Sequence, residues 1–202
     1  GNVVPTAADT ITVAILENPG SGTLSGTSTL NAINGIASFN DLSIDKAGIG
    51  YTLEVTSGNL TAATSGAFDV SAGYAAFLGF TTEPKDSNGG DTMPTVVVSI
   101  LDNNGNVVPT ASDSVNVRIW ANPSSGILSG TTMVNASAGV ASFSTLSIDK
   151  SGVGYTLQAR ITGLAATLSA TFSINVGPAA FLTFASQPSS TAVGQTLPSV
   201  EV

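Results

Sequence analysis

The sequence repeats itself at a fixed distance of 104 residues. Four motifs return at this spacing: Gly1-Asn2-Val3-Val4-Pro5-Thr6-Ala7 from Gly105, Leu42-Ser43-Ile44-Asp45-Lys46 from Leu146, Gly50-Tyr51-Thr52-Leu53 from Gly154, and Ala75-Ala76-Phe77-Leu78 from Ala179. About half of the aligned positions are identical, with no insertion or deletion. Two stretches this similar must share a fold, so the repeat constrains the chain more than any other feature.

The phase of the repeat divides the chain into one whole unit and two partial ones. We predict a complete domain over 75–178, a domain over 1–74 that lacks its first strands, and over 179–202 the opening strands of a further domain. The partial units are complementary, because together they supply 98 of the 104 positions. We expect the sequence to be a window on a longer polypeptide. The alternative is that 179–202 of one chain completes the sandwich begun by 1–74 of the next.

Apolar and polar residues alternate along most of the complete unit, which is typical of half-buried strands. Val96, Val98 and Ile100 share one face of a predicted strand, and Asn103-Asn104-Gly105 follows as a tight turn. Only 9% of the residues are charged, and runs of helix-forming residues are missing. With seven or eight short strands per unit and no convincing helix, we predict an all-β fold of tandem immunoglobulin-like β-sandwiches.

Each copy places a tyrosine at the start of a strand, directly after a bend that contains glycine. These residues are Tyr51 and Tyr155. This is the setting of a tyrosine corner, in which the phenol bonds to upstream backbone while the ring packs in the core. We therefore expect both tyrosines to be structural.

Longer elements of the repeat point to a type of domain. They are Gly-Asn-Val-Val-Pro, Gly-x-Leu-Ser-Gly-Thr at 22–27 and 126–131, and Ala-Ser-Phe-x-x-Leu-Ser-Ile-Asp-Lys-x-Gly-x-Gly-Tyr-Thr-Leu at 37–53 and 141–157. Together they resemble the bacterial immunoglobulin-like (Big-type) tandem repeats of large surface proteins, over essentially the whole chain. The resemblance implies an extracellular or cell-surface location and carries no catalytic residues. Such repeats serve as adhesin stalks, enzyme spacers, sheath proteins and fibres.

The sequence lacks the side chains that many enzymes use. It has no histidine and no cysteine, which excludes Ser-His-Asp catalysis, thiol chemistry and cysteine zinc sites. The 13 acidic residues are spread thinly, and Asp41, which brackets a bend with Asp45, becomes Thr145 in the second copy. We therefore predict that the chain is not an enzyme and has no catalytic, cofactor-binding or metal-ligating residues.

One segment deserves comparison with a calcium loop. In Asp102-Asn103-Asn104-Gly105-Asn106 the glycine falls one place early and no glutamate follows, so a plain turn is favoured. Calcium binding at junctions between domains of an acidic extracellular protein stays an open alternative. Asp86 and Asp91 are the other candidate ligands.

A possible contact surface centres on Trp120, the single tryptophan, which falls on the polar side of its predicted strand beside Arg118. An exposed aromatic residue stacks on sugar rings or sits in subunit contacts. The counterpart in the first copy is Leu16, which favours a packing or intermodule contact over a ligand site.

The net charge and the placement of the basic residues limit the partners that the chain can bind. The net charge is −8, and the five basic residues are scattered, whereas nucleic acids and anionic membranes select clustered Lys and Arg. No apolar run is long enough to span a bilayer. We expect a structural module of an extracellular or cell-surface fibre, stalk or sheath, with neighbouring copies of the repeat as partners, in one long chain or as a head-to-tail homopolymer. The alternative is a carbohydrate- or protein-binding adhesin module.

Overall fold

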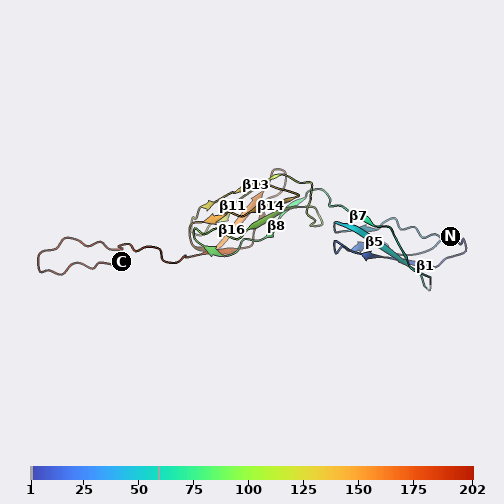
Figure 1. Ribbon diagram of the computed structural model, residues 1–202, viewed down its shortest axis with the longest axis horizontal. Helices are drawn as coiled ribbons and strands as arrows, with labels where there is room; N and C mark the ends of the chain where they lie inside the picture. Colours follow the sequence, from blue (N-terminus) through green and yellow to red (C-terminus); the bar gives the residue numbers. More distant parts are fainter. Residues whose placement is uncertain (1, 59) are drawn as a thin grey trace.

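The computed structural model describes residues 2–58 and 60–202, and within these ranges the chain forms strands, turns and loops without any helix. Gly1 and Asn59 lie outside the described residues. Figure 1 shows three parts in a row along the long axis. We name them the first unit (2–74), the complete unit (75–178) and the tail (179–202). The prediction of an all-β fold is confirmed.

The complete unit is built from two main sheets. One sheet has the order β14-β10-β8 and the other has the order β13-β11-β16-β18-β9, with β17 beside β16. The strands are β8 (Phe77–Thr82), β9 (Ser87–Asn88), β10 (Val96–Leu101), β11 (Ser114–Ala121), β12 (Leu128–Ser129), β13 (Met133–Asn135), β14 (Val140–Phe143), β15 (Ser147–Ile148), β16 (Gly152–Arg160), β17 (Thr167–Leu168) and β18 (Phe172–Asn175). Seven of these strands are three residues or longer.

The alternation seen in the sequence builds one core between these two sheets. Val96 and Val98 of β10 are fully buried, as are Val115 of β11 and Leu157 of β16. These side chains belong to a single apolar cluster to which both sheets contribute. Because each sheet buries one face against the other, the complete unit is a β-sandwich.

The first unit repeats every strand of the complete unit from β11 onward except β14. Its strands are β1 (Thr10–Glu17), β2 (Leu24–Ser25), β3 (Thr29–Asn31), β4 (Ser43–Ile44), β5 (Gly48–Thr56), β6 (Ala63–Thr64) and β7 (Phe68–Val70). Each begins 104 residues before its counterpart. Even the bulge recurs, since the register of β1 on β5 shifts between Ile15 and Glu17, as that of β11 on β16 shifts between Ile119 and Ala121.

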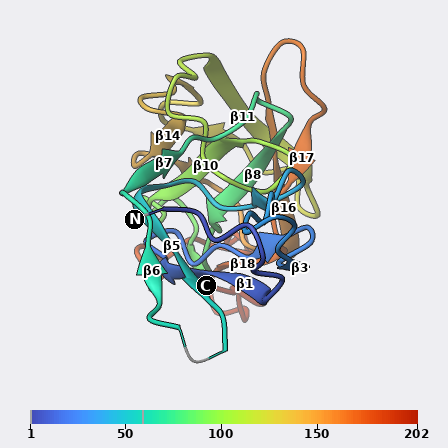
Figure 2. The same cartoon turned by 90° about the vertical axis from the view of Figure 1, so that its right-hand side faces the viewer.

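The first unit has no second layer among the described residues, because nothing there takes the places of β8 and β10. Without a β10 equivalent, residues 37–40 carry no strand, whereas their counterparts form β14. Phe143 of β14 is buried, but Phe39 is only half-buried. Phe68 is 36% exposed where its counterpart Phe172 is 4% exposed. Figure 2 looks along the long axis from the end at which this unit lies.

The tail extends beyond the complete unit, away from the first unit (Figure 1). It has no regular strand, and its two halves pair around an isolated bridge between Ser186 and Glu201. Leu182 is 88% exposed, although its counterpart Leu78 is buried. The tail therefore has the sequence of core strands without a core.

Candidate functional site

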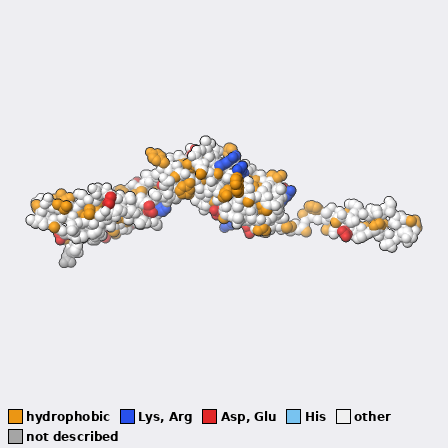
Figure 3. Space-filling view, turned by 180° about the vertical axis from the view of Figure 1, so that it is seen from behind, with side chains coloured by type: hydrophobic (Ala, Val, Ile, Leu, Met, Phe, Trp, Pro, Cys, Tyr) orange, Lys and Arg blue, Asp and Glu red, His pale blue; other side chains and the backbone are white. Residues whose placement is uncertain are grey.

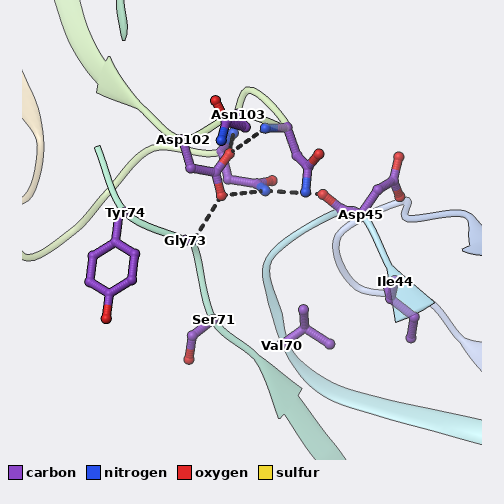
Figure 4. Close-up of a pocket in the computed structure, with 10 residues that line it drawn as sticks. Ile44, Asp45, Val70, Ser71, Gly73, Tyr74, Asp102 and Asn103 are labelled. Carbon is purple, nitrogen blue, oxygen red and sulfur yellow. Dashed lines mark hydrogen bonds between the residues drawn. The ribbon is translucent and has the colours of Figure 1, made fainter. Parts of the chain in front are cut away.

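The first and complete units meet at the turn that follows β10. Gly105 adopts a positive φ of 77°, which lets the chain reverse tightly after Asp102. The turn is closed by two backbone hydrogen bonds, from Gly105 N–H to the Asp102 carbonyl (3.0 Å) and from Asp102 N–H to the Asn106 carbonyl (2.9 Å). This geometry points the Asp102 carboxylate into the junction, where it is buried (Figure 4).

Four N–H groups donate to this carboxylate. Oδ1 accepts from the backbone of Asn104 and of Asn106, both at 2.9 Å. Oδ2 accepts from the backbone of Gly73 at 2.8 Å and from the side-chain amide of Asn106 at 3.0 Å. Burial raises the pKa of the Asp102 carboxyl, but the hydrogen bonds outweigh burial and lower the pKa from 3.8 to about 2. Asp102 is thus ionised at neutral pH and ties the linker residue Gly73 to the complete unit.

Asn106 carries the contact across to the first unit. Its side-chain amide donates to the Asp45 carbonyl at 3.0 Å, and its Oδ1 accepts from the Ala47 backbone N–H at 3.1 Å. Nearby, Lys46 Nζ donates to the Asn104 carbonyl at 2.7 Å. Asn106 therefore pairs with the 45–47 loop through two hydrogen bonds, which fixes both the distance and the orientation of that loop.

The 45–47 loop is itself held from inside the first unit. The Tyr51 hydroxyl donates to the Lys46 carbonyl at 2.9 Å, and the Tyr51 ring is fully buried. Tyr155 makes the same bond to the Lys150 carbonyl, also at 2.9 Å. This bond to upstream backbone is the one that defines a tyrosine corner. Tyr51 thus anchors the 45–47 loop, which contacts Asn106 of the complete unit.

Figure 4 shows the junction as a shallow polar hollow, lined by Ile44, Asp45, Val70, Ser71, Asp102 and neighbouring residues. The Tyr74 side chain points away from the hydrogen-bonded group and is almost fully exposed. Within this hollow Asn106 hydrogen-bonds to Asp102 and to the 45–47 loop. These bonds link the first unit to the complete unit.

The candidate calcium ligands take part in hydrogen bonds within the chain. Asp86 Oδ1 accepts from the Ser173 backbone at 2.7 Å, and Asp91 Oδ2 accepts from the Asn88 amide at 3.0 Å. Across residues 2–58 and 60–202, no three His, Cys, Asp or Glu side chains gather in a way that would hold a metal ion. In the same ranges no helix is long and apolar enough to cross a bilayer.

The two acids at the bend of the first unit also hold backbone. The Asp41 carboxylate accepts from the N–H and the hydroxyl of Thr27, and these bonds lower its pKa. Thr145 accepts from the equivalent backbone group in the complete unit, at 2.9 Å from Thr131. Asp45 Oδ1 accepts from the Thr23 backbone at 2.6 Å. The bend acids thus stabilise loops.

The predicted contact residues Trp120 and Arg118 lie on β11, and Leu16 lies on its counterpart β1. Trp120 and Leu16 are the extra residues of the β-bulges in β11 and β1. Their side chains are 55% and 47% exposed. The Arg118 guanidinium lies 5.4 Å from the centre of the Trp120 ring, within cation–π range. Arg118 and Arg160 also line a shallow groove beside β11. On the face shown in Figure 3, Lys and Arg gather on the complete unit.

The interpretation of residues 102–106 as a plain turn assigns no contact to Asp102 or Asn106, so their role in the junction was not predicted. A signal was available, since Asn2 and Asn106 belong to the repeated Gly-Asn-Val-Val-Pro motif although neither is a core residue. A polar residue that recurs at the edge of a repeat, outside the core pattern, indicates a contact between repeats.

Comparison with known proteins gives only distant likenesses. No protein-family model matches the chain, and no curated protein matches it. Among solved structures it is similar to a β-glycosidase from Bacteroides vulgatus (13% identity, 84% of this chain, 21% of that chain, TM-score 0.43). It is also similar to a glycosyl hydrolase family 2 member from Bacteroides cellulosilyticus (14%, 83%, 22%, 0.43) and to a β-glucuronidase of that family (16%, 84%, 18%, 0.42). The chain spans about a fifth of the length of these proteins.

Proposed function

We propose that this chain is a non-catalytic structural module of an extracellular or cell-surface fibre, stalk or sheath, in which Big-type immunoglobulin-like sandwiches follow one another end to end. Its partners are neighbouring copies of the same repeat. The observation that carries the proposal is the junction, where Asn106 and Asp102 connect the linker, the 45–47 loop and the next domain through paired hydrogen bonds. A joint of this kind sets the reach and the stiffness of an array.

The repeat supports the proposal, because the groups that the first unit contributes to the junction recur in the complete unit. Asp149 and Lys150 stand in the complete unit where Asp45 and Lys46 stand in the first unit, and Tyr155 holds their loop as Tyr51 does. The complete unit therefore presents the same backbone to a following domain.

A distance measurement between the two units tests the proposal. The chain has no cysteine, so Thr56→Cys and Ser114→Cys place one spin label on an exposed residue of each unit. Electron–electron double resonance should give a single narrow distribution of distances between the two labels if the joint is stiff. A broad distribution, as two domains on a free linker would give, would contradict the proposal.

The second candidate function is a carbohydrate- or protein-binding adhesin module, and exposed Trp120 beside Arg118 favours it. A tryptophan face with a neighbouring guanidinium suits a sugar that carries a carboxylate. Binding to an array of acidic glycans that is lost in Trp120→Ala and kept in the bulge control Leu16→Ala would support this function. Absence of binding by the unmodified chain would reject it.

A further inference from the structure

The sheet that contains β11 and β16 turns a positively charged face to solvent. Val117 of β11 is buried in the core, so the next residue, Arg118, lies on the opposite, outer face. Ala159 of β16 is also buried, which places Arg160 on the same outer face. Both arginines are exposed, and they are two of only five basic residues in a chain of net charge −8. We define the arginine face by Arg118, Trp120 and Arg160.

Neutral side chains hold the two guanidinium groups in place. Arg118 Nε donates to Gln158 Oε1 at 2.8 Å, and its guanidinium lies over the Trp120 ring. Arg160 Nε donates to Asn116 Oδ1 at 3.2 Å. These contacts order the arginines, which line one shallow groove, but they do not compensate the positive charges. An ordered guanidinium pairs well with a carboxylate, so the arginine face suits an acidic partner.

Two acids lie on the equivalent face of the first unit. Glu54 of β5 follows Leu53, which lines the apolar inner side of the sheet, so Glu54 lies on the outer side. Glu17 pairs with Thr52 of β5, two residues from Glu54, and therefore shares that outer side. We define the acid face by Glu17, Glu54 and the exposed Leu16, which is the counterpart of the tryptophan in the arginine face.

The repeat keeps the inner side of this sheet and changes the charge of its outer side. Val13 and Leu53 on the inner side recur unchanged 104 residues later. On the outer side Ala14 and Thr56 stand in the first unit where the complete unit has its two arginines. In turn, the complete unit has alanine and glutamine in place of the two acids. One face of the repeat is therefore acidic in the first unit and basic in the complete unit.

We propose that the arginine face binds the acid face of a second copy of this chain, so that the complete unit of one copy lies beside the first unit of another. Opposite charges on equivalent faces favour neighbours that are staggered by one repeat, because two like faces repel each other. Trp120 and Leu16 add exposed apolar side chains to the two faces. The inference goes beyond the proposed function, since an end-to-end array does not require contacts between the sides of its modules.

An acidic glycan is the other partner that the arginines suit. It does not account for the acids on the equivalent face of the first unit, whereas a second copy of the chain accounts for both faces. The observations therefore favour the second copy, and the glycan becomes an outcome of the test.

Reversing the charge of one face at a time tests the proposal. Both faces are acidic in Arg118→Glu/Arg160→Glu, and both are basic in Glu17→Lys/Glu54→Lys. Sedimentation of either variant should show the dissociation constant for self-association raised at least about tenfold. The measurement belongs at physiological ionic strength, where charges more than about 8 Å apart are largely screened and the net charge matters little.

A mixture of the two variants should associate again, because each variant offers the face that the other lacks. Its dissociation constant should return close to that of the unmodified chain. Recovery of this kind cannot come from misfolding, since both variants must be folded to produce it. Arg118→Gln/Arg160→Gln, which removes the two charges without reversing them, should also weaken association and replaces the reversed variant if that variant unfolds.

The matched control is Lys85→Glu/Lys150→Glu, which changes the net charge by the same amount at exposed positions outside β11 and β16. The control should associate as the unmodified chain does. An equal loss in the control would overturn the proposal, as would an unmodified chain that stays monomeric at all concentrations or folded reversed variants that do not recover when mixed.

Binding to an acidic glycan array, lost in Arg118→Glu/Arg160→Glu and without any self-association, would also overturn the proposal and assign the arginine face to carbohydrate. The spin-label distances across the junction are measured within one chain, after dilution with unlabelled chain. They do not depend on lateral contacts, so failure of lateral association and failure of the array function are distinguishable.

Discussion

Asn106 and Ala47 belong to different units, yet Asn106 Oδ1 accepts a hydrogen bond from the Ala47 backbone N–H at 3.1 Å. Backbone recognition of this kind does not depend on the side chain at position 47. In the complete unit the counterpart of Ala47 is Ser151, so the two copies differ in the side chain but both keep the backbone N–H. The contact can therefore be kept in successive repeats whose sequences have diverged at the receiving loop.

Asn106→Ala should loosen the joint without unfolding either unit. The substitution removes the side-chain bonds to Asp45, Ala47 and Asp102, each worth about 0.5–1.5 kcal/mol. The spin-label distance distribution between the units should broaden. Asn2→Ala is the matched control, because Asn2 is the same residue of the repeat but is exposed and far from this junction. An unchanged distribution in Asn106→Ala would show that the linker alone sets the geometry.

The joint should also weaken in acid. The pKa of Asp102 is about 2 in the folded chain and 3.8 is its ordinary value, so the folded state binds the proton less tightly than the unfolded state does. The stabilisation that ionised Asp102 contributes is therefore fully present above about pH 4 and is lost as the pH falls through about 2. Distance distributions recorded at pH 6 and near pH 2 should differ in the unmodified chain.

Asp102→Asn separates this effect from that of other carboxylates, Asp41 among them, whose pKa is also lowered. The variant should have a broad distribution at both pH values, because an amide accepts fewer of the four hydrogen bonds and does not titrate. If the distance distribution of Asp102→Asn instead changes with pH as that of the unmodified chain does, another titrating group is responsible.

How much of this could be predicted from the sequence depends on the kind of interaction. Core strands follow from period-two alternation, as Val115 and Val117 illustrate, because burial of one sheet face is a local property of the pattern. The role of Asn106 was beyond this reasoning, since a hydrogen bond to Asp45 joins residues that are 61 positions apart. The exposure of Trp120 was consistent with its outward position, but the bulge that displaces it appears only in the strand register.

Tyr155→Phe should cost the complete unit about 1 kcal/mol, because the ring stays buried against Phe172 while the hydroxyl bond to the Lys150 carbonyl is lost. The melting temperature should fall by roughly 4 to 8 °C, as expected for a domain of this size. Tyr74→Phe is the control, since the Tyr74 side chain is 97% exposed and should tolerate the change without any shift. Equal shifts in both variants would mean that the corner bond adds nothing to stability.

Phe143 and Phe39 occupy the same place in the repeat but face different surroundings, and their truncation should differ accordingly. Phe143→Ala opens a cavity in a closed sandwich and should destabilise the complete unit by about 3 to 5 kcal/mol. Phe39→Ala removes a half-buried ring from the first unit and should cost less than about 1 kcal/mol. Chemical denaturation at low protein concentration should show this difference. Equal costs in the two variants would mean that the smaller sheet does not decide how deeply this phenylalanine is buried.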